Sequence, residues 1–573
     1  MIGLIAVTAT GRAAAARLAA ALPGTRTYPD PARGAIPRAF AECDQIVCFL
    51  AVGAAVRLIA PLLTSKGADP GVVCVDESLA FAVPVTGAHQ GGGNGLARAV
   101  ADVLGATAVI TTASDAVGMP ALDEFGAGLG LRVEPGSQLA EVGTAVLSGE
   151  RVTLSMEQTW PVPALPPNVT STVAPEPGFP AIVITDRRIG SLTAAAPPRV
   201  IYRPPSLVLG AGASRGVTAA EVGDLMDKVL VDAGLSAASV RQVATVDLKE
   251  DERGLVEAAR ERGWEISGFA PADLAVVPVP NPSEAVRAVI GTPSVAEAAA
   301  LLAAGRGAVL AAHKRKSPRA TVAVARRLPR GRLALVGLGP GARDLITPRS
   351  VAELRQASVV VGLGQYLDQI RDLLRPGTHV LASELGAEEE RAAAAVAQAR
   401  AGRAVALVGS GDAGIYAMAS PALEFADSSI EVVGAPGVTA ALAAAAALGA
   451  PLGHDHAAIS LSDLHTPWEA IERRITAAAE ADFVVCFYNP RSSGRGGHLA
   501  KALALLAAHR PPGTPVGMVA EASLPGQRIT LSTLAGFDPS QADMRTLVVV
   551  GSSATRIVAG RMVTPRGYRW RER

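Results

Sequence analysis

Aromatic residues and cysteines are scarce in this sequence of 573 residues. Aromatic side chains make up only 3% of the chain, so the hydrophobic cores are expected to consist mostly of Ala, Val and Leu. The four cysteines form no C-x-x-C pair, which argues against a disulfide framework or zinc ribbon and fits a reducing cytoplasm. We predict a cytoplasmic protein without a protein-bound metal. Its cysteines are Cys43, Cys48, Cys74 and Cys486.

The sequence also lacks a large net charge and a long apolar run. The formal net charge is +1 and no basic run is interleaved with aromatic residues, so we expect no nucleic-acid partner. The most apolar window, Val438–Gly453, is shorter than the ~18–20 residues of a membrane span, so no membrane association is expected. Near the start, Gly11 and Arg12 interrupt the apolar run, which predicts a strand, a turn and a helix rather than a signal peptide.

Short runs of β-branched residues alternate with helical patterns along almost the whole chain. This alternation predicts the α/β class, with helices covering mainly parallel sheets. A prior of roughly 150 residues per domain gives three to five domains. The expected strands are QIVCFLAV, GVVCVD, AVITTAS, AIVIT, LAVVPV, LALVGL, SVVVGL, AVALVGS, FVVCFY and TLVVVGSS.

Two segments interrupt the alternation. Thr159–Pro180 is rich in Pro, Ser and Thr, and this composition predicts a loop or hinge. Arg315–Arg332 is dense in Arg and contains Pro318 and Pro329, which predicts a surface linker at the main domain junction.

The stretch Leu335–Ser350, LVGLGPGARDLITPRS, resembles the glycine turn of a dinucleotide-binding unit. Such a unit needs a helix that opens on the glycines and an acidic residue at the end of the second strand. Here the predicted helix starts only at Thr347-Pro348, and the second strand ends in Gly362 with no acid there. An NAD-linked oxidoreductase is therefore a distant alternative, which binding of S-adenosylmethionine (SAM) without NAD would exclude.

Four more strand ends carry small or polar residues: GSGDAGIYAMASPA, GAPGVTA, FVVCFYNPRS and VVVGSSATR. The first has no Lys for a phosphate, so it is not a Walker loop, and its one carboxylate is Asp412. Each motif taken alone could equally be a tight turn, with Asp412 as a helix N-cap. Together, such strand ends form the ligand crevice of an open α/β sheet.

The order of these motifs resembles that of the tetrapyrrole methylases over about residues 331–566, and in particular the precorrin-3B C(17)-methyltransferases. One departure is Ala417, where that family usually has Gly. The resemblance implies the two-domain α/β fold of class III SAM methyltransferases, methylation at C-17 with ring contraction, and a homodimer formed through this half. It implies that the tetrapyrrole lies along Gly337, Gly339 and Gly341. It implies that SAM contacts Pro340, Ser410, Gly411, Asp412, Ile415, Thr439, Ala440, Asn489 and Ala522.

Ring contraction needs proton transfers, whereas methyl transfer from a sulfonium needs little acid–base help. We predict His456 and Asp463 as the acid–base residues, with His454, Asp455 and His465 as further candidates. Each histidine could equally be a solvated or capping residue.

The N-terminal half contains HQGGGNGLA on a loop that enters a predicted helix. His89 is predicted as a general base with Asp115 as its partner, and suspicion would shift to Glu77 or Asp115 if His89 is only a loop residue. The glycines are expected to turn backbone N–H groups towards an oxyanion, and Gly92 and Asn94 are the predicted substrate-binding residues.

Almost all of residues 1–327 resembles the cobalt-precorrin-5A hydrolase family, which opens a δ-lactone and releases acetaldehyde. Many members have a Cys in the loop that corresponds to Ala211–Gly216, and this sequence has none, which favours water attack. The prediction is a bifunctional enzyme of cobalamin biosynthesis. The alternative is that its N-terminal half is a non-catalytic module that binds tetrapyrrole or a partner. Whether cobalt is already in the ring stays open. The predicted domains are 1–135, 136–204, 205–327, 328–435 and 436–573.

Overall fold

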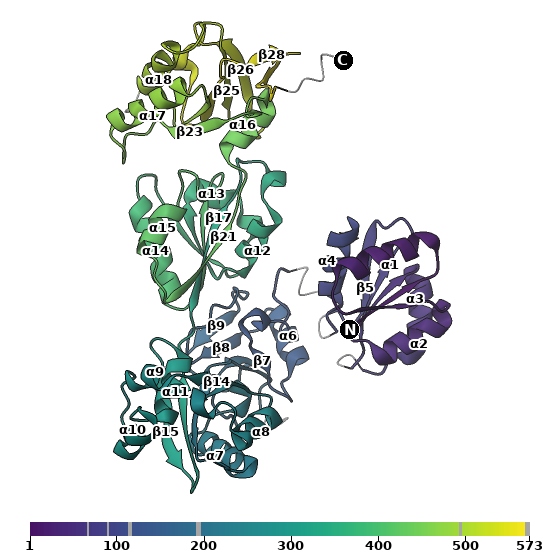
Figure 1. The fold of residues 1–573 in the computed structure, drawn as a ribbon. Helices are drawn as coiled ribbons and strands as arrows, with labels where there is room; N and C mark the ends of the chain where they lie inside the picture. Colours follow the sequence, from purple (N-terminus) through teal and green to yellow (C-terminus); the bar gives the residue numbers. More distant parts are fainter. Residues whose placement is uncertain (66–67, 89–90, 113–116, 191–195, 492–495, 568–573) are drawn as a thin grey trace. The chain divides into compact units, whose positions relative to one another are not determined.

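The computed structural model describes the chain except for residues 66–67, 89–90, 113–116, 191–195, 492–495 and 568–573. The chain divides into two compact units, and each is built of helices and strands (Figure 1). The first unit comprises Met1–Pro329 with Arg375–Gly377, and the second comprises Arg330–Leu374 with Thr378–Arg573. Sheets covered by helices make up both units, which confirms the predicted α/β class.

The first sheet of the first unit has the strand order β2-β1-β3-β4-β5-β6 and is parallel except between β4 and β5. Its strands are β1 (Ile2–Ala6), β2 (Thr25–Tyr28), β3 (Gln45–Phe49), β4 (Gly71–Val75), β5 (Phe81–Thr86) and β6 (Thr107–Ala108). Helices α1 (Ala9–Ala21) and α4 (Gly93–Leu104) bury one face, and α2 (Ala32–Glu42) and α3 (Val52–Ile59) bury the other. The strand, turn and helix predicted at the start of the chain are β1 and α1.

The second sheet has the order β7-β11-β10-β8-β9, with helix α6 (Leu139–Leu147) against it. The prediction of a loop or hinge over Thr159–Pro180 is wrong in part, because this segment contains strand β9. It also buries Trp160, Val162 and Leu165 in the core, since apolar side chains between the prolines pack on the sheet. The strands are β7 (Arg132–Val133), β8 (Val152–Met156), β9 (Val169–Thr172), β10 (Ala181–Ile184) and β11 (Arg199–Arg203).

The third sheet of the first unit has the order β14-β13-β12-β16-β15. Its strands are β12 (Leu207–Ala213), β13 (Val240–Val246), β14 (Glu265–Phe269), β15 (Val309–Lys316) and β16 (Ala320–Arg326). Its helices are α7 (Ala219–Asp232), α8 (Arg253–Glu261), α9 (Pro271–Ala275), α10 (Glu284–Ile290) and α11 (Val295–Ala304).

Two sequence-based predictions fail in this sheet. The surface linker expected over Arg315–Arg332 is mostly the antiparallel pair β15–β16, because the alternating Thr-Val-Ala-Val-Ala run buries one of its strands. The strand expected for LAVVPV is instead the end of α9 and a loop, because Pro271 opens a helix in front of it.

The first sheet of the second unit is fully parallel, with the order β19-β18-β20-β17-β21. Its strands are β17 (Gly331–Gly337), β18 (Val359–Leu363), β19 (His379–Ser383), β20 (Ala404–Gly409) and β21 (Ile430–Ala435). Its helices are α12 (Pro348–Gln356), α13 (Gly364–Asp368), α14 (Glu388–Arg400) and α15 (Ala419–Phe425). The helix start predicted at Thr347-Pro348 is confirmed, since the Thr347 hydroxyl accepts a hydrogen bond from Ser350 N.

The second sheet of this unit has the order β23-β24-β27-β25-β26 and is parallel only between β23 and β24. The prediction of mainly parallel sheets is therefore wrong here. The strands are β23 (His456–Ser460), β24 (Val484–Tyr488), β25 (Pro515–Ala520), β26 (Arg528–Thr533) and β27 (Thr546–Val550), and a small separate sheet holds β22 (Gly449–Ala450), β28 (Arg556–Val558) and β29 (Arg561–Val563). The helices are α16 (Ala440–Leu448), α17 (Trp468–Glu480) and α18 (His498–Ala507).

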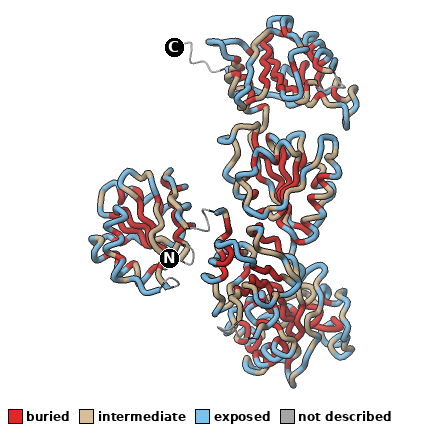
Figure 2. Tube along the Cα trace, turned by 180° about the vertical axis from the view of Figure 1, so that it is seen from behind, coloured by how far each residue is buried: buried red, intermediate tan, exposed pale blue. Residues whose placement is uncertain are grey.

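Buried residues follow the strands of each sheet and the inward faces of the helices (Figure 2). All four cysteines are buried, and none of them is paired in a disulfide. Among the residues described, no single helix has the length and apolar composition of a membrane span, and one bent helix pair, α10 with α11, meets that test by length and composition only.

Candidate active sites

Three loops of the second unit meet at the carboxyl ends of β17, β20 and β21. Gly339 N donates to Gly411 O at 3.0 Å, and Gly411 N donates to Gly339 O at 2.7 Å. A Cβ at Gly337 would lie 2.7 Å from Gly411 O, and one at Gly437 would lie 2.0 Å from the same oxygen. These glycines are therefore required by close contact between backbones, and a contact of Gly337, Gly339 and Gly341 with substrate stays a prediction.

Asp412 fixes two of these loops to each other. Its Oδ1 accepts a hydrogen bond from Gly414 N at 2.8 Å, and its Oδ2 accepts one from Gly437 N at 3.0 Å. The next helix, α15, has Met418 rather than Asp412 at its N-cap, so the alternative role of Asp412 as a simple helix cap is wrong. Each carboxylate oxygen keeps a second lone pair for another donor.

The second loop also reaches the start of α16. A Cβ at Gly411 would lie 3.6 Å from Thr439 Cα and 3.7 Å from Ala440 N. The predicted cofactor residues Gly411, Thr439 and Ala440 therefore lie side by side.

Two tyrosines connect this region to the second sheet. The Tyr488 hydroxyl lies 2.6 Å from Thr439 Oγ1 and accepts a hydrogen bond from Ala441 N at 3.1 Å. The Tyr416 hydroxyl donates to Ala458 O at 2.8 Å, and the two tyrosine ring centroids are 5.2 Å apart. Burial raises the pKa of both phenols. The sequence-based predictions did not include these tyrosines among the site residues. Both tyrosines nevertheless lie inside motifs on which the predictions depended, GSGDAGIYAMASPA and FVVCFYNPRS.

Strained backbone is concentrated around the same loops. Seven described residues other than glycine have a positive φ, and four of them are Tyr416, Asn489, Glu521 and Ser523. Residues held in the left-handed region cost energy and cluster at functional sites. These four residues lie on the loop after β20, the loop after β24 and the loop after β25, which favours a ligand site where these loops meet.

The loop after β25 contacts the loop after β17. Ala342 N donates to Ser523 Oγ at 3.2 Å, and a Cβ at Gly341 would lie 2.7 Å from Leu524 Cδ2. Asn489 Nδ2 donates to Ser460 Oγ at 3.0 Å. The contacts thus bring together the loops that carry all the predicted cofactor residues, which are Pro340, Ser410, Gly411, Asp412, Ile415, Thr439, Ala440, Asn489 and Ala522. Binding of the cofactor by these residues stays a prediction.

The two predicted acid–base residues of this unit are not brought together. His456 is the first residue of β23, and Asp463 follows the other end of that strand. Asp463 faces His498 instead, with 3.6 Å between its Oδ2 and the Nε2 of that histidine. His498 Nδ1 lies 3.1 Å from Leu461 O, and its ring stacks on Trp468 with 4.5 Å between centroids. An acid–base role for His456 or for Asp463 stays a prediction.

In the first unit, the glycines of HQGGGNG lie beside the first residues of β3 and β4. Gln45 Nε2 donates to Gly91 O at 3.2 Å and to Gly92 O at 3.1 Å, and a Cβ at Gly71 would lie 2.3 Å from Gly91 O. Gly93 N donates to Gly87 O at 2.9 Å, and Asn94 N donates to Ala88 O at 2.7 Å. The prediction that these glycines present free N–H groups to an oxyanion is therefore wrong for Gly93.

The remaining predicted residues of this unit are only partly described. His89 and Asp115 lie outside the described residues. Glu77 accepts a hydrogen bond from Thr8 Oγ1 at 3.0 Å and follows the carboxyl end of β4, whereas Gly92 lies at the amino end, roughly 17 Å away along the five residues of that strand. Asn94 is buried, and its Nδ2 donates to Thr112 Oγ1 at 3.2 Å. Glu77 therefore does not share a site with Gly92 and Asn94.

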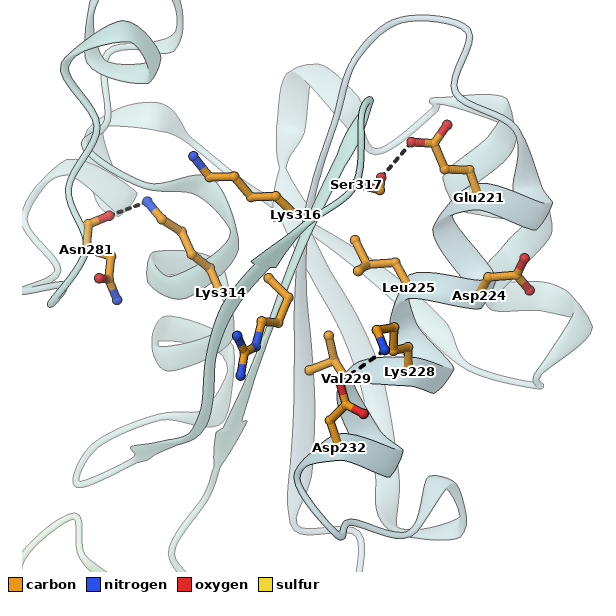
Figure 3. Close-up of a pocket in the computed structure, with 11 residues that line it drawn as sticks. Glu221, Asp224, Leu225, Lys228, Val229, Asp232, Asn281, Lys314, Lys316 and Ser317 are labelled. Carbon is orange, nitrogen blue, oxygen red and sulfur yellow. Dashed lines mark hydrogen bonds and ion pairs between the residues drawn. The ribbon is translucent and has the colours of Figure 1, made fainter.

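A pocket of about 730 Å³ lies between α7 and β15 (Figure 3). Glu221 accepts from Ser317 Oγ at 2.6 Å, the Lys228 ammonium lies 3.5 Å from the Asp232 carboxylate, and Lys314 Nζ donates to Asn281 O. The Arg-rich segment that was predicted as a linker thus forms one wall of a polar pocket. Among the described parts of the chain, no group of three or more His, Cys, Asp or Glu side chains is placed to hold a metal ion.

Comparison with known families covers almost the whole chain. Residues 332–538 match the tetrapyrrole (corrin/porphyrin) methylases. Residues 35–115 match the N-terminal part of cobalamin synthesis G, residues 120–204 match the cobalamin biosynthesis central region, and residues 207–325 match the C-terminal part of cobalamin synthesis G.

Individual relatives cover the second unit. A probable cobalt-factor III C(17)-methyltransferase of Salmonella typhimurium is 47% identical over 239 residues, or 41% of this chain and 99% of that protein. A precorrin-3B C(17)-methyltransferase of Sinorhizobium is 43% identical over 249 residues, or 42% of this chain and 97% of that protein. The crystal structure of the methyltransferase CobJ is 41% identical and covers 41% of this chain and all 100% of its own, with a TM-score of 0.40.

The match to the methylase family, together with the two helix-covered sheets, places the second unit in the class of α/β methyltransferases with two sheets. The chain belongs to the tetrapyrrole methylases, and it is a fusion in which the parts of cobalamin synthesis G precede the methylase. The sequence-based identification of a bifunctional enzyme of cobalamin biosynthesis is thereby confirmed.

Proposed function

We propose that the second unit transfers a methyl group from SAM to C-17 of precorrin-3B or cobalt-precorrin-3, with contraction of the ring. The names of the relatives from Salmonella and Sinorhizobium support this reaction. The single observation that carries it is the gathering of the loops after β17, β20, β21, β24 and β25 by direct contacts. The proposed ligands are SAM and a tetrapyrrole, and the proposed assembly is a homodimer formed through this unit.

The residues of this site bind and position rather than react. SAM supplies a methyl group that is already electrophilic, so most of the rate comes from positioning and from exclusion of water. The free lone pairs of Asp412 receive the ammonium of the methionyl group. Gly411, with φ of +67° and its Cβ position facing Thr439 and Ala440, leaves room for a close approach of the ligand.

Calorimetric titration of the full chain tests this proposal. Wild-type protein is expected to bind SAM and not NAD, and Gly411→Val is expected to lose SAM affinity. Because a side chain at a positive φ is strained, the melting temperature of the second unit is measured for the same variant. Unchanged SAM affinity in Gly411→Val would place the cofactor elsewhere, and binding of NAD in place of SAM would restore the oxidoreductase alternative.

For the first unit, we propose hydrolysis of the δ-lactone of cobalt-precorrin-5A, with release of acetaldehyde. His89 is proposed to deprotonate the attacking water, because its unperturbed pKa suits a base near neutral pH. His89→Ala should then abolish acetaldehyde release and leave methylation intact, as shown by trapping acetaldehyde and by mass spectrometry of the corrinoid. Release at the parent rate would reduce His89 to a loop residue and leave Asp115 as the remaining candidate.

A second candidate for the first unit is a binding module without catalysis. The observation that favours it is that Gly93 N and Asn94 N are already bonded to the backbone, while Glu77 lies at the opposite ends of the strands. Under this alternative, the wild-type chain would release no acetaldehyde from the lactone but would still bind it. Equilibrium binding of the lactone, measured beside acetaldehyde release, separates the two functions.

A further inference from the structure

The start of α16 is capped in an unusual way. Thr439 occupies the N-cap position, where a threonine hydroxyl normally accepts a hydrogen bond from the second or third residue of the helix. Here the Thr439 side chain makes no such bond. Ala441 N, the donor of the second helical residue, is bonded instead to the Tyr488 hydroxyl at 3.1 Å. A residue of the second sheet thus supplies the acceptor that Thr439 would ordinarily supply.

The short contact between Tyr488 and Thr439 has a preferred direction. Their oxygens are 2.6 Å apart. A phenol is a much stronger acid than an alcohol, and the Tyr488 oxygen already accepts from Ala441 N, so the phenol donates and the Thr439 oxygen accepts. The Thr439 proton must then point away from Tyr488. It is free to be donated to a ligand.

The position of Thr439 makes this proton useful. Thr439 Cα faces Gly411 across the loops, at 3.6 Å from the Cβ position of that glycine, and Thr439 is only partly exposed. Tyr488 is itself held in place by the ring of Tyr416, whose backbone has a φ of 52°. The side chain that orients Thr439 is thus fixed from a second direction.

We propose that Tyr488 is a positioning residue for the methyl donor: it replaces Thr439 as the cap of α16 and so turns the Thr439 hydroxyl into a hydrogen-bond donor to an acceptor atom of SAM. This inference rests on the proposed function of the second unit. It assigns a role to Tyr488, which was absent from the predicted site, and it explains why a threonine at an N-cap does not cap its helix.

Removal of the Tyr488 hydroxyl should affect binding more than folding. In Tyr488→Phe, Ala441 N loses its acceptor, and Thr439 can rotate to become the ordinary cap. The helix start is then satisfied, but the Thr439 oxygen is engaged with the backbone and its proton is redirected. The melting temperature of the second unit should therefore change by no more than about 2 °C, while the dissociation constant of SAM rises about 10-fold.

The test is a double-variant cycle on the full chain, with calorimetric titration of SAM. Tyr488→Phe and Thr439→Val should each weaken binding about 10-fold, and the double variant should be no weaker than either, because both changes remove the same hydrogen bond. Thr439→Ser keeps the hydroxyl and should lose less SAM affinity than Thr439→Val. Tyr28→Phe, which deletes a phenol hydroxyl bonded to Glu42 in the first unit, is the matched control and should also bind as wild type.

Four results would overturn the inference. Wild-type affinity in Tyr488→Phe would show that the phenol only caps the helix. If the fold-increases in the dissociation constant of SAM multiply in the double variant, Tyr488 and Thr439 act independently. A loss of affinity that appears only together with a large fall in melting temperature would show a purely structural role. A wild-type chain that binds no SAM would overturn the proposed function of the unit, and this inference with it.

Discussion

Both units contain a glycine-rich loop region, but the two regions lie at opposite ends of their strands. In the second unit, the glycines follow the carboxyl ends of β17, β20 and β21 and join three loops to one another. In the first unit, Gly91–Gly93 lie beside the first residues of β3 and β4, against Gln45 and Gly71. The carboxyl ends are where open α/β sheets bind ligands. A glycine-rich loop therefore indicates only that two backbone segments lie in close contact. Polar side chains beside the glycines are needed to indicate a ligand site.

The cause of this difference is one antiparallel strand. Strand β5 runs antiparallel to β4, so it carries the chain back to the amino ends before HQGGGNG begins. In the second unit, β17, β20 and β21 are all parallel, so each of them delivers its loop to the same edge. Both regions are rich in glycine, and the direction of the preceding strand decides at which end of the sheet each region lies.

The largest expected effect is the loss of stability when the contact of the three loops in the second unit is broken. Gly437→Ala places a Cβ 2.0 Å from Gly411 O, and we expect it to lower the free energy of unfolding of that unit by about 3 kcal/mol. Gly434→Ala is the matched control, because nothing lies within 4 Å of its Cβ position. Thermal unfolding of both variants measures the difference. Equal stability of the two would show that the loops do not meet as described.

A slightly smaller effect concerns the polar side chain beside those glycines. Asp412→Asn removes the negative charge and one of the two acceptor oxygens, and we expect SAM affinity to fall about 100-fold. Titration calorimetry measures the loss. The control is Glu77→Gln in the first unit, which should leave SAM affinity unchanged. A similar loss in both variants would remove the contrast between the two regions.

In the first unit, too, substitution of a glycine should be destabilising only where its Cβ position meets another backbone segment. Gly71→Ala introduces a Cβ 2.3 Å from Gly91 O and should destabilise the first unit by about 2 kcal/mol. Gly95→Ala lies in helix α4 with nothing within 4 Å of its Cβ position, and it should stabilise that unit by about 0.5–1 kcal/mol. Denaturant unfolding of the two variants checks both signs. Destabilisation by Gly95→Ala would contradict the close-contact explanation.

The smallest expected effect concerns Asp427, which resembles Asp412 only in accepting a hydrogen bond from the backbone N–H two residues further along the chain. Asp427 accepts from Ser429 N at 2.8 Å and pairs with Arg400, and its hydrogen bonds to Ser429, followed by Arg400, lower its pKa to about 2. Because the folded-state pKa lies below the ordinary value, its contribution to stability is present above pH ~4 and is lost as the pH falls from ~4 to ~2. Acid titration of stability should show a smaller loss in Asp427→Asn than in wild type over that window. The difference is small because the carboxylate is exposed.

Much of the second unit could be predicted from the sequence, because its signals are local. The start of α12 is encoded in Thr347-Pro348, and the parallel β17, β18 and β20 are encoded in short apolar runs. The gathering of Gly411, Thr439 and Ala440 follows once β20 and β21 both run parallel to β17, because parallel strands bring their carboxyl ends to one edge. Tyr488 was missed because its role depends on a tertiary contact between β24 and the start of α16.

The failures of prediction have the same physical origin. The alternating pattern of β16 indicates a strand, but it does not indicate that β15 is its pairing partner. The β15–β16 hairpin was therefore mistaken for a linker. The proline-rich segment has loop composition, yet Trp160 and Leu165 bury it against a sheet. Pairing partners and strand directions are set by tertiary structure, which a single sequence does not display.

The most direct test of the central claim is mass spectrometry of the tetrapyrrole after incubation of the full chain with SAM and either precorrin-3B or cobalt-precorrin-3. We expect one added methyl group, placed at C-17 of a contracted ring, with wild-type protein, and almost none with Asp412→Asn. Fragmentation of the product locates the methyl group. Absence of a methylated product with both substrates, or an equal yield from Asp412→Asn, would contradict the assignment of the methyl-transfer site to the joined carboxyl ends of β17, β20 and β21.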